Sequence, residues 1–470
     1  MLFTTVTFVV FYLLVAATYF ALTPRFRAQN VVLLVASYVF YGFWDWRFCG
    51  ILALSTSINF ICGLIIDSSQ DEKKRKAAAA FAIIVSLSIL GFFKYYNFFA
   101  DQLAALLQVF GLGGTHDTLK IVLPVGMSFY TFKEISYIID VYKGKFKAER
   151  NPLSFALYVS FFAQLVAGPI ERGSQLLPQI NAPRKVSPLD IEMGVFLILY
   201  GYFLKLVIGD NVSPVANQVF NNYEGYRGLD MLLGMFAYAL QIYGDFAGYS
   251  SIARGIARIL GFHLPINFKL PYFSRNPSDF WQRWHVTLSQ WLRDYLYISL
   301  GGNRKGTIRT NVNLLLTMLL GGFWHGAAWN FIAWGGYHGV ILVGHHWYSK
   351  PEVKKPTLPP KLASGLSIVL MFLFTLVGWV LFRAHSMDQI FGMLSRIGFS
   401  RSHETNGFIK TVFACAIPLF LIEWYQQSKL DLVPQLQWKP VYRLGAYVGI
   451  LLAIALLGAR QATEFIYFQF

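Results

Sequence analysis

The chain opens with the apolar block 2-LFTTVTFVVFYLLVAATYFA-21, twenty residues without a single charge. A helix of this length extends about 30 Å, which matches the hydrocarbon thickness of a lipid bilayer. The block is longer than the apolar core of a signal peptide and has no basic segment before it. It therefore predicts a first membrane-spanning helix that is retained.

Similar apolar blocks recur along the 470 residues and set the class of protein. Hydrophobic residues make up 55% of the chain, charged residues only 14%, and the mean hydropathy is +0.47. Soluble domains carry about 25% charged residues. We expect an all-α polytopic membrane protein with roughly eleven to thirteen spans plus interfacial or re-entrant helices. The predicted spans lie near residues 2–22, 31–47, 50–66, 77–100, 120–140, 153–170, 189–209, 229–247, 311–347 (long enough for two), 363–383, 408–424 and 441–459.

The basic residues gather in short patches between these blocks, as in 73-KKRK-76 and 143-KGKFK-147. Although the formal net charge is +16, this pattern indicates contact with anionic lipid headgroups and not with nucleic acid. Arg25, Arg27 and the patch at 73–76 occupy alternate loops, which the positive-inside rule places in the cytoplasm. The N-terminus is then predicted to lie outside.

Several classes of enzyme lack support in the sequence. Cys49, Cys62 and Cys415 are scattered in apolar stretches and are interpreted as small buried hydrophobes, with no metal-ligand spacing. The chain has no P-loop, no H-E-x-x-H and no G-x-S-x-G motif. These absences argue against an ATPase, a zinc enzyme or a serine hydrolase.

Polar groups interrupt the apolar pattern in 278-SDFWQRWHVTLSQWLRDYLYISL-300. Its aromatic and leucine residues recur at spacings of three and four, which predicts one helix with an aromatic stripe at the interface or buried among other helices. His285 lies beside the stripe. It is either a hydrogen-bonded histidine packed between tryptophans or a functional group, because polar residues at membrane depth are costly. The stripe consists of Trp281, Trp284, Leu288, Trp291 and Tyr295.

A second segment, 317-TMLLGGFWHGAAWNFIAWGGYHG-339, carries His325 and His338. A neutral imidazole is well suited to remove a proton at physiological pH. On one straight helix the two histidines would point to nearly opposite sides, so His338 is interpreted as structural unless the glycines break the helix. Those glycines either allow close helix packing or leave room for a substrate. They are Gly321, Gly322 and Gly326.

Between these segments lies the glycine-rich basic turn 301-GGNRKGTIRT-310. Such a turn either cradles the phosphates of a cytoplasmic cofactor or meets lipid phosphate.

Several motifs together resemble the membrane-bound O-acyltransferase (MBOAT) superfamily, most closely its bacterial branch that takes part in alginate O-acetylation. The resemblance implies a single domain over residues 1–470, with a signature core at about 120–347 and helices around a transmembrane tunnel. Its W-H-G histidine falls on His325 and its second signature position on His285. The motifs are 123-LPVGMSFYTF-132, 137-YIIDVYKGK-145, 168-GPIER-172, 245-DFAGYS-250, 280-FWQRWHVTLSQWLRDYLYISLGGNR-304 and 320-LGGFWHGAAWNF-331.

The resemblance implies an acetyltransferase of the bacterial cytoplasmic (inner) membrane. Acetyl-CoA would supply acetyl from the cytoplasm, and an extracellular or periplasmic SGNH-type partner would place it on a polysaccharide. No resident cofactor or metal is expected. His325 would be the general base, and His285 would orient the acceptor, stabilise the oxyanion or line the tunnel. Other candidate residues are Trp281, Trp284, Trp324 and Asn313 for the tunnel, and Asn303, Arg304 and Lys305 for the CoA phosphates.

Two alternatives stay open. One is D-alanyl transfer from a carrier protein toward teichoic acid, and the other is a non-enzymatic transporter or flippase with histidine proton relays. Ser251 stands where alginate-type members are expected to carry aspartate, so the acceptor polymer is not fixed by the resemblance.

Overall fold

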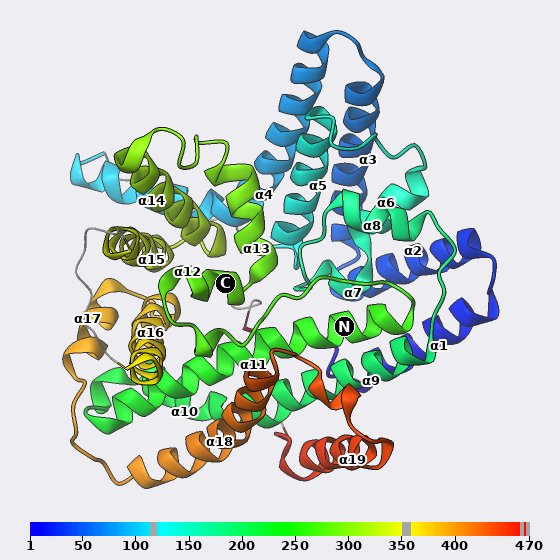
Figure 1. The fold of residues 1–470 in the computed structure, drawn as a ribbon. Coiled ribbons are helices and arrows are strands. Elements are labelled where there is room, and N and C mark those ends of the chain that lie inside the picture. The colour runs from blue at the N-terminus through cyan, green and yellow to red at the C-terminus, as the bar shows by residue number, and fades with distance from the viewer. Residues whose placement is uncertain (113–118, 120, 350–358, 461–464, 467–470) are drawn as a thin grey trace. The chain divides into compact units, whose positions relative to one another are not determined.

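The computed structural model describes residues 1–112, 119, 121–349, 359–460, 465 and 466. Among these residues the regular elements are all helices, joined by turns and irregular segments, and one isolated β-bridge links Gly228 to Ile397 (Figure 1). The predicted all-α class is therefore confirmed. The chain divides into two compact units, Met1–Gly194 with Ala253–Pro265 and Val195–Ile252 with Ile266–Phe470. That the chain forms one domain stays a prediction.

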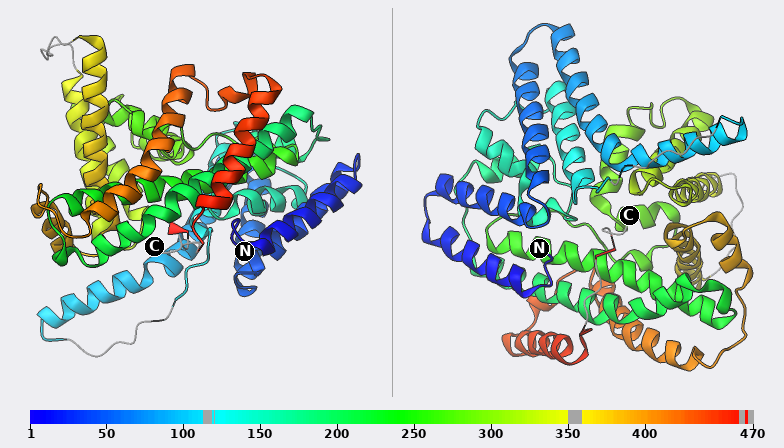
Figure 2. Two further views of the ribbon diagram at one scale, coloured as in Figure 1. Left: turned by 90° about the horizontal axis from the view of Figure 1, so that it is seen from below. Right: turned by 180° about the vertical axis from the view of Figure 1, so that it is seen from behind.

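Three helices of the first unit, α3 (Arg47–Ser68), α4 (Glu72–Val109) and α5 (Met127–Tyr142), lie side by side (Figures 1 and 2). Gly63 lets α3 approach α5, because a Cβ there would meet Cε1 of Tyr137 at 2.8 Å. The remaining helices of the unit are α1 (Val6–Ala21), α2 (Phe26–Gly42), α6 (Pro152–Ser160), α7 (Phe162–Leu165), α8 (Gly173–Ile180), the beginning of α9 (Pro188–Tyr202) and the end of α11 (Leu229–Ile259).

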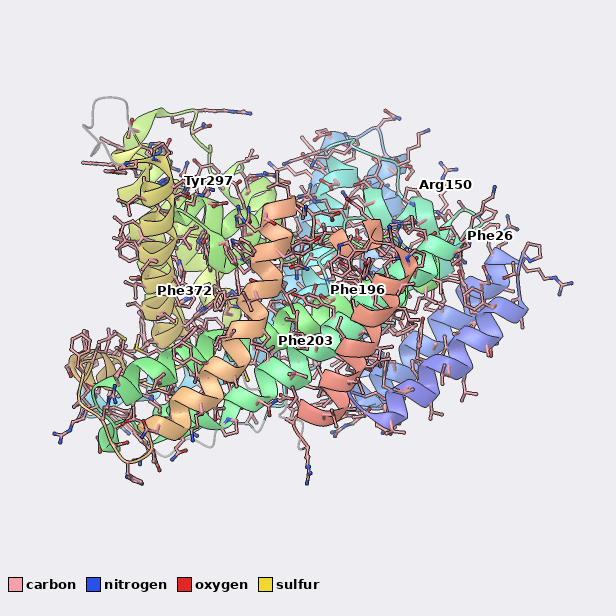
Figure 3. The ribbon with its side chains drawn as sticks, turned by 60° about the horizontal axis from the view of Figure 1, so that its bottom comes forward. Phe26, Arg150, Phe196, Phe203, Tyr297 and Phe372 are labelled. Atoms are coloured by element: carbon pink, nitrogen blue, oxygen red, sulfur yellow. The ribbon has the colours of Figure 1, made fainter. Side chains whose placement is uncertain are left out.

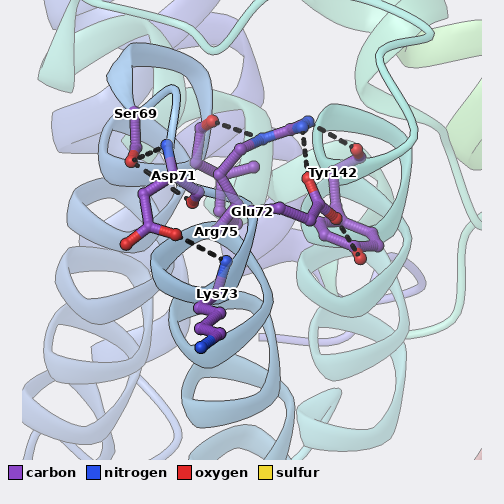
Figure 4. Close-up of polar contacts among 7 residues, drawn as sticks. Ser69, Asp71, Glu72, Lys73, Arg75 and Tyr142 are labelled. Atoms are coloured by element: carbon purple, nitrogen blue, oxygen red, sulfur yellow. Dashed lines mark hydrogen bonds and ion pairs between the residues drawn. The ribbon is translucent and has the colours of Figure 1, made fainter.

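The basic patch at 73–76 joins the ends of these three helices (Figure 4). Arg75 donates to Glu72 at 2.8 Å and to the backbone carbonyl of Tyr142 at 2.8 Å. The Tyr142 hydroxyl closes the cluster by donating to Glu72 at 2.7 Å. The three lysines of the patch are exposed, as contact with anionic headgroups requires.

The second unit carries the histidine segments. It continues α9 through the π-helix η1 (Phe203–Gly209) into α10 (Asp210–Asn221), and Phe196 and Phe203 lie along this continuous segment (Figure 3). The other helices are η2 (Tyr223–Gly225), most of α11, η3 (Pro271–Phe273), α12 (Pro277–Arg283), α13 (Val286–Trp291), η4 (Leu292–Tyr297), α14 (Gly306–His325), α15 (Trp329–Tyr348), α16 (Pro360–Arg383), α17 (Met387–Ser395), α18 (Thr405–Lys429), η5 (Pro434–Gln437) and α19 (Pro440–Leu457).

Six helical segments of the described chain are long and apolar enough to cross a membrane. They confirm the polytopic membrane class, while the full count of eleven to thirteen spans stays a prediction. None of the apolar 18-residue window of α19 is buried, as expected for a helix that faces lipid. The six segments are Arg47–Ser68, Glu72–Val109, Pro188–Asn221, Pro360–Arg383, Thr405–Lys429 and Pro440–Leu457.

The predicted continuous span at 153–170 is wrong. The helix breaks at Phe161, where ψ is 113°, and the chain beyond α7 is irregular. Pro169 disfavours a helical conformation at Gly168. The break leaves the segment buried inside the first unit, where protein and not lipid satisfies its irregular backbone.

The core of the second unit contains a buried ion cluster. Lys205 of η1 donates to Asp210 at 2.7 Å and to Asp245 of α11 at 2.6 Å. Gly201 and Gly248 bring the two helices together, since a Cβ on Gly201 would meet the Gly248 carbonyl oxygen at 2.6 Å. The cluster thus joins the α9–α10 segment to α11, the helix that packs against His285 through Phe246.

Substituting Asp245→Ala should destabilise the protein by about 3–5 kcal/mol, because one buried cation loses a partner. The apparent melting temperature in detergent measures the effect. The matched control is Asp388→Ala, which removes an exposed carboxylate and should leave the melting temperature unchanged. Equal melting temperatures for both variants would contradict a stabilising role for the cluster.

Candidate functional site

His285 lies at a sharp break between two short helices. The predicted continuous helix over 278–300 is wrong, since α12 ends at Arg283 and α13 begins at Val286. His285 itself has φ 42° and ψ 54°, a left-handed conformation that is uncommon outside glycine and often marks functional positions. The side chain is fully buried. The aromatic stripe is therefore divided, with Trp281 on α12, Trp284 in the break, Leu288 and Trp291 on α13, and Tyr295 on η4 (Leu292–Tyr297).

Asn267 fixes the orientation of the His285 ring. Its Oδ1 lies 3.0 Å from Nδ1 of His285 and also accepts from the Thr287 hydroxyl at 2.9 Å. With an acceptor opposite Nδ1, the ring carries its proton there, and Nε2 holds the lone pair. Burial lowers the pKa of His285 to about 3. The imidazole is therefore neutral at physiological pH.

His325 ends α14 at the tip of a helical hairpin. The chain breaks after it at Gly326 and turns back as α15, antiparallel to α14 (Figure 1). The His325 ring is 7% exposed and packs against Trp324 at 4.8 Å, Trp334 at 5.0 Å and Phe382 at 5.3 Å between centroids. Three aromatic side chains thus hold the imidazole.

The glycines around His325 serve helix packing. A Cβ on Gly322 would meet the Phe331 carbonyl oxygen at 2.3 Å, and one on Gly326 would meet the Phe331 ring at 2.0 Å. On the facing helix, a Cβ on Gly335 would meet the Met318 carbonyl oxygen at 2.4 Å. Of the two functions considered for these glycines, the structure supports close approach of α14 and α15.

The hairpin brings His338 close to the other histidines, which a straight helix would have prevented. His338 is 1% exposed and packs on Trp334 at 4.8 Å, Trp281 at 5.1 Å and Phe280 at 5.9 Å. Trp334 contacts both His325 and His338. The glycines therefore do break the helix.

A connected set of rings joins His285 to His325. The ring of His285 lies 6.4 Å from Phe268 between centroids, and Trp284 contacts Phe268 at 5.0 Å and Trp379 at 4.7 Å. Trp379 and Phe382 then lead to His325. We call this set the aromatic chamber. It consists of Phe268, Phe280, Trp281, Trp284, Trp334, Trp379 and Phe382.

Several predicted site residues lie elsewhere. Asn313 is buried and donates to the Gly302 carbonyl at 2.8 Å, so it anchors the glycine-rich turn about 18 Å along α14 from His325. Asn303, Arg304 and Lys305 are exposed on that turn. Trp281 and Trp284, by contrast, belong to the chamber, and Trp324 contacts His325.

Sequence reasoning missed the residues that hold the histidines from other elements. Asn267 lies in an irregular segment and Phe382 at the end of a membrane span, where no motif marks them. Phe246 packs edge-on against His285 at 4.7 Å. Its place inside the motif 245-DFAGYS-250 was the available signal.

A depression of about 550 Å³ lies beside the chamber. No carboxylate lines it, and Val286, the neighbour of His285, forms part of its wall. It offers Lys269, Arg293, which is paired with Asp294 at 2.7 Å, and several hydrogen-bonding side chains, a surface suited to an anion. The lining residues are Lys269, Trp281, Gln282, Val286, Ser289, Gln290 and Arg293.

The fold and site define a polytopic membrane protein with buried histidines in an aromatic chamber. Residues 149–387 match the model of the membrane-bound O-acyltransferase family, and the chain belongs to this family. It is 42% identical to the probable alginate O-acetylase AlgI of Azotobacter vinelandii over 78% of this chain and 72% of the relative. It is also 31% identical to the peptidoglycan O-acetyltransferase of Helicobacter pylori over 96% and 93% of the two chains.

A more partial match is the teichoic acid D-alanyltransferase of Bacillus subtilis, 31% identical over 57% of this chain and 70% of the relative. All three relatives are named as acyl-transferring enzymes. The chain is therefore an O-acyltransferase of the membrane, and the non-enzymatic transporter alternative is set aside.

A pair of glycine substitutions on α15 tests the hairpin. Gly335→Ala should lower both the melting temperature and acyl transfer, because its Cβ cannot fit against α14. Gly344→Ala, with nothing within 4 Å of the new Cβ, should stabilise the same helix by about 0.5–1 kcal/mol. Thermal unfolding in detergent and an activity assay measure both; a stabilising Gly335→Ala would show that the helices do not pack this closely.

Proposed function

We propose that the chain moves acetyl from cytoplasmic acetyl-CoA across the membrane for O-acetylation of an extracellular or periplasmic polysaccharide. The observation that carries this proposal is His325, buried against Trp334 and Phe382 at the tip of the α14–α15 hairpin. Similarity to an alginate O-acetylase over most of the chain supports acetyl as the group and an alginate-like polymer as the acceptor.

In this mechanism His325 acts as general base. It takes the proton of the acceptor hydroxyl while the hydroxyl oxygen attacks the thioester carbonyl. The tetrahedral intermediate collapses to the ester, and the leaving thiolate takes a proton to give the free thiol of CoA. General-base assistance of this kind contributes typically about 10²–10⁴-fold in rate. The aromatic chamber excludes the water that would hydrolyse the thioester.

His285 is assigned the positioning of the acceptor. Its Nδ1 is committed to Asn267 Oδ1, which leaves Nε2 as an acceptor for the proton of a hydroxyl group. A lone pair at Nε2 cannot donate to an oxyanion. Of the three roles considered for His285, orientation of the acceptor hydroxyl therefore suits the ring best.

The donor is proposed to enter by the depression beside Val286. Lys269 and Arg293 in its wall would meet the phosphates of CoA. Arg304 and Lys305, with the amide of Asn303 beside them, add a second basic group after η4, the π-helix that Arg293 helps to form. Charge-assisted contacts of this kind hold the pantetheine arm so that the thioester reaches the chamber.

The same cations suggest the orientation in the bacterial inner membrane. Lys269, Arg293, Arg304 and Lys305 are basic residues of short segments, which the positive-inside rule places in the cytoplasm. The acceptor then comes from the other side, together with an SGNH-type partner. The N-terminus is proposed to lie outside, as the basic loops after α1 and α3 require.

D-alanyl transfer from a carrier protein is the second candidate function. The similarity to the teichoic acid enzyme of Bacillus subtilis covers 57% of this chain, whereas the similarities to the two O-acetylating relatives cover 78% and 96%. Acetyl is therefore preferred. Purified protein that takes labelled D-alanine from a charged carrier and ignores acetyl-CoA would reverse this choice.

Replacing His325 by Ala should lower acetyl transfer by about 10²–10⁴-fold, because the general base is lost. Label transfer from [¹⁴C]acetyl-CoA in nanodiscs measures the rate, with the melting temperature as a folding control. His346→Ala changes a histidine of the same hairpin that is only partly buried, near the end of α15, and should retain the rate. A folded His325→Ala variant with full activity would remove the base from the mechanism.

Lys269→Gln should raise KM for acetyl-CoA by about 10-fold with little change in kcat, since one charge-assisted phosphate contact is removed. The double variant Arg304→Gln/Lys305→Gln tests the second basic group in the same assay. If neither variant changes KM, the phosphates bind elsewhere and the proposed donor entry is wrong.

A further inference from the structure

Two tryptophans of the aromatic chamber carry N–H groups without a hydrogen-bond acceptor. The Nε1 atoms of Trp281 and Trp334 are buried, and neither has a hydrogen-bond partner among the residues that the structure describes. An indole nitrogen can only donate. A buried tryptophan N–H usually finds an acceptor, and buried polar atoms in folded proteins are nearly always paired. Two such donors in one chamber indicate an acceptor that the described chain does not supply.

The two indoles lie together and share His338 as a neighbour. The centroids of Trp281 and Trp334 are 5.7 Å apart, with the rings at 77° to each other. His338 packs on Trp281 at 5.1 Å and on Trp334 at 4.8 Å. Its Nδ1 is also buried without a hydrogen-bond partner in the described part of the chain. Three rings that meet in one place therefore each carry an unpaired nitrogen, inside a chamber that is otherwise apolar.

These rings connect the proposed donor entry to the proposed base. Trp281 lines the depression beside Val286, and Trp334 packs against His325 at 5.0 Å between centroids. A thioester that enters from the depression would meet Trp281 first and then reach Trp334 beside the base. The donors that hold an oxyanion and the group that activates the nucleophile must both reach the same reacting carbon. The contact between Trp334 and His325 places a donor and the base together.

The proposed reaction needs a hydrogen-bond donor at this point. When the hydroxyl oxygen bonds to the thioester carbonyl carbon, the π electron pair of that carbonyl moves to its oxygen and forms an oxyanion. The lone pair at Nε2 of His285 cannot stabilise this charge. Neutral N–H donors in a water-excluded site can, because such hydrogen bonds are stronger there than in water. They also leave no charge buried in the resting protein.

From these contacts we infer that the N–H groups of Trp281 and Trp334 bind the carbonyl oxygen of the thioester and stabilise the oxyanion of the tetrahedral intermediate. This inference rests on the proposed function and supplies the donors that it lacks. The oxyanion accepts both hydrogen bonds, and no proton leaves either indole. When the intermediate collapses, the electron pair returns to the carbon, the C–S bond breaks, and the thiolate takes the proton that His325 holds.

Trp334→Phe keeps an aromatic ring and removes the N–H. Transfer of label from acetyl-CoA in nanodiscs should show kcat lowered by about 10²–10³-fold, as for the loss of one oxyanion donor. KM for acetyl-CoA should change little, because the hydrogen bond is stronger to the oxyanion than to the carbonyl. Trp281→Phe should change kcat in the same direction. The matched control is Trp347→Phe, which changes a 59% exposed tryptophan of the same helix, α15, and should keep kcat.

An isosteric replacement covers the case in which the phenylalanine variants fail to fold or leave a cavity. Benzothienylalanine at position 334 or 281 keeps the shape of the indole and has sulfur in place of the N–H. It should lower kcat as the phenylalanine variant does, with the melting temperature of the wild type. If folded protein with this residue at both positions transfers acetyl at the wild-type rate, the indoles only fill space and the inference is wrong.

The carbonyl stretch of bound acetonyl-CoA gives a readout that packing alone would not move. Two N–H donors polarise the carbonyl, so infrared difference spectra of full-length protein in nanodiscs should show the isotope-labelled carbonyl at a lower frequency than in free acetonyl-CoA. Benzothienylalanine at both positions should remove most of this shift, and Trp347→Phe should keep it. Equal carbonyl frequencies in the wild type and the benzothienylalanine protein would contradict binding by the indoles.

Two results separate this inference from the proposed function. If the wild type transfers acetyl and the protein without the two N–H groups keeps both its kcat and the carbonyl frequency, the indole donors are wrong and acetyl transfer stands. If the wild type lowers the carbonyl frequency of acetonyl-CoA through Trp281 and Trp334 but never cleaves acetyl-CoA, the proposed transfer fails while the carbonyl site stands.

Discussion

The close approach of α14 and α15 is the contact on which the rest of the site depends. Gly322 lies against the backbone of α15 and Gly335 against that of α14, so neither position has room for a Cβ. Without hydrophobic driving force inside a bilayer, small residues that let backbones pack are what holds such helices together. The contact places His325 and His338 on either side of Trp334 and lets α16 close the chamber through Trp379 and Phe382.

Much of the architecture could be predicted from the sequence, because a long apolar segment without charged residues indicates a membrane-spanning helix. Leu2–Ala21 and 363–383 are found as helices with small shifts of their ends. The break at Trp284–His285 could not be predicted in this way. The three-four spacing of aromatic residues continues across it, and the compensating partner, Asn267, lies outside the segment.

The site was predicted in part for the same reason. His285 and His325 could be identified because a polar side chain is energetically costly in an apolar segment. The structure joins them through one set of rings. Asn313, a tunnel candidate by the family resemblance, instead anchors the glycine-rich turn. Asn267, Phe246 and Phe382 hold the histidines by tertiary contacts, and such contacts leave no local pattern in a sequence.

The central claim is that a donor thioester and an acceptor hydroxyl meet in the aromatic chamber between His285 and His325. A cryo-EM structure of the protein in nanodiscs with the non-hydrolysable analogue acetonyl-CoA tests it most directly. We expect the acetonyl group within the chamber beside His325 and the CoA phosphates at Lys269 and Arg293. Density for the acetonyl group outside the chamber, with both histidines remote from it, would contradict the account.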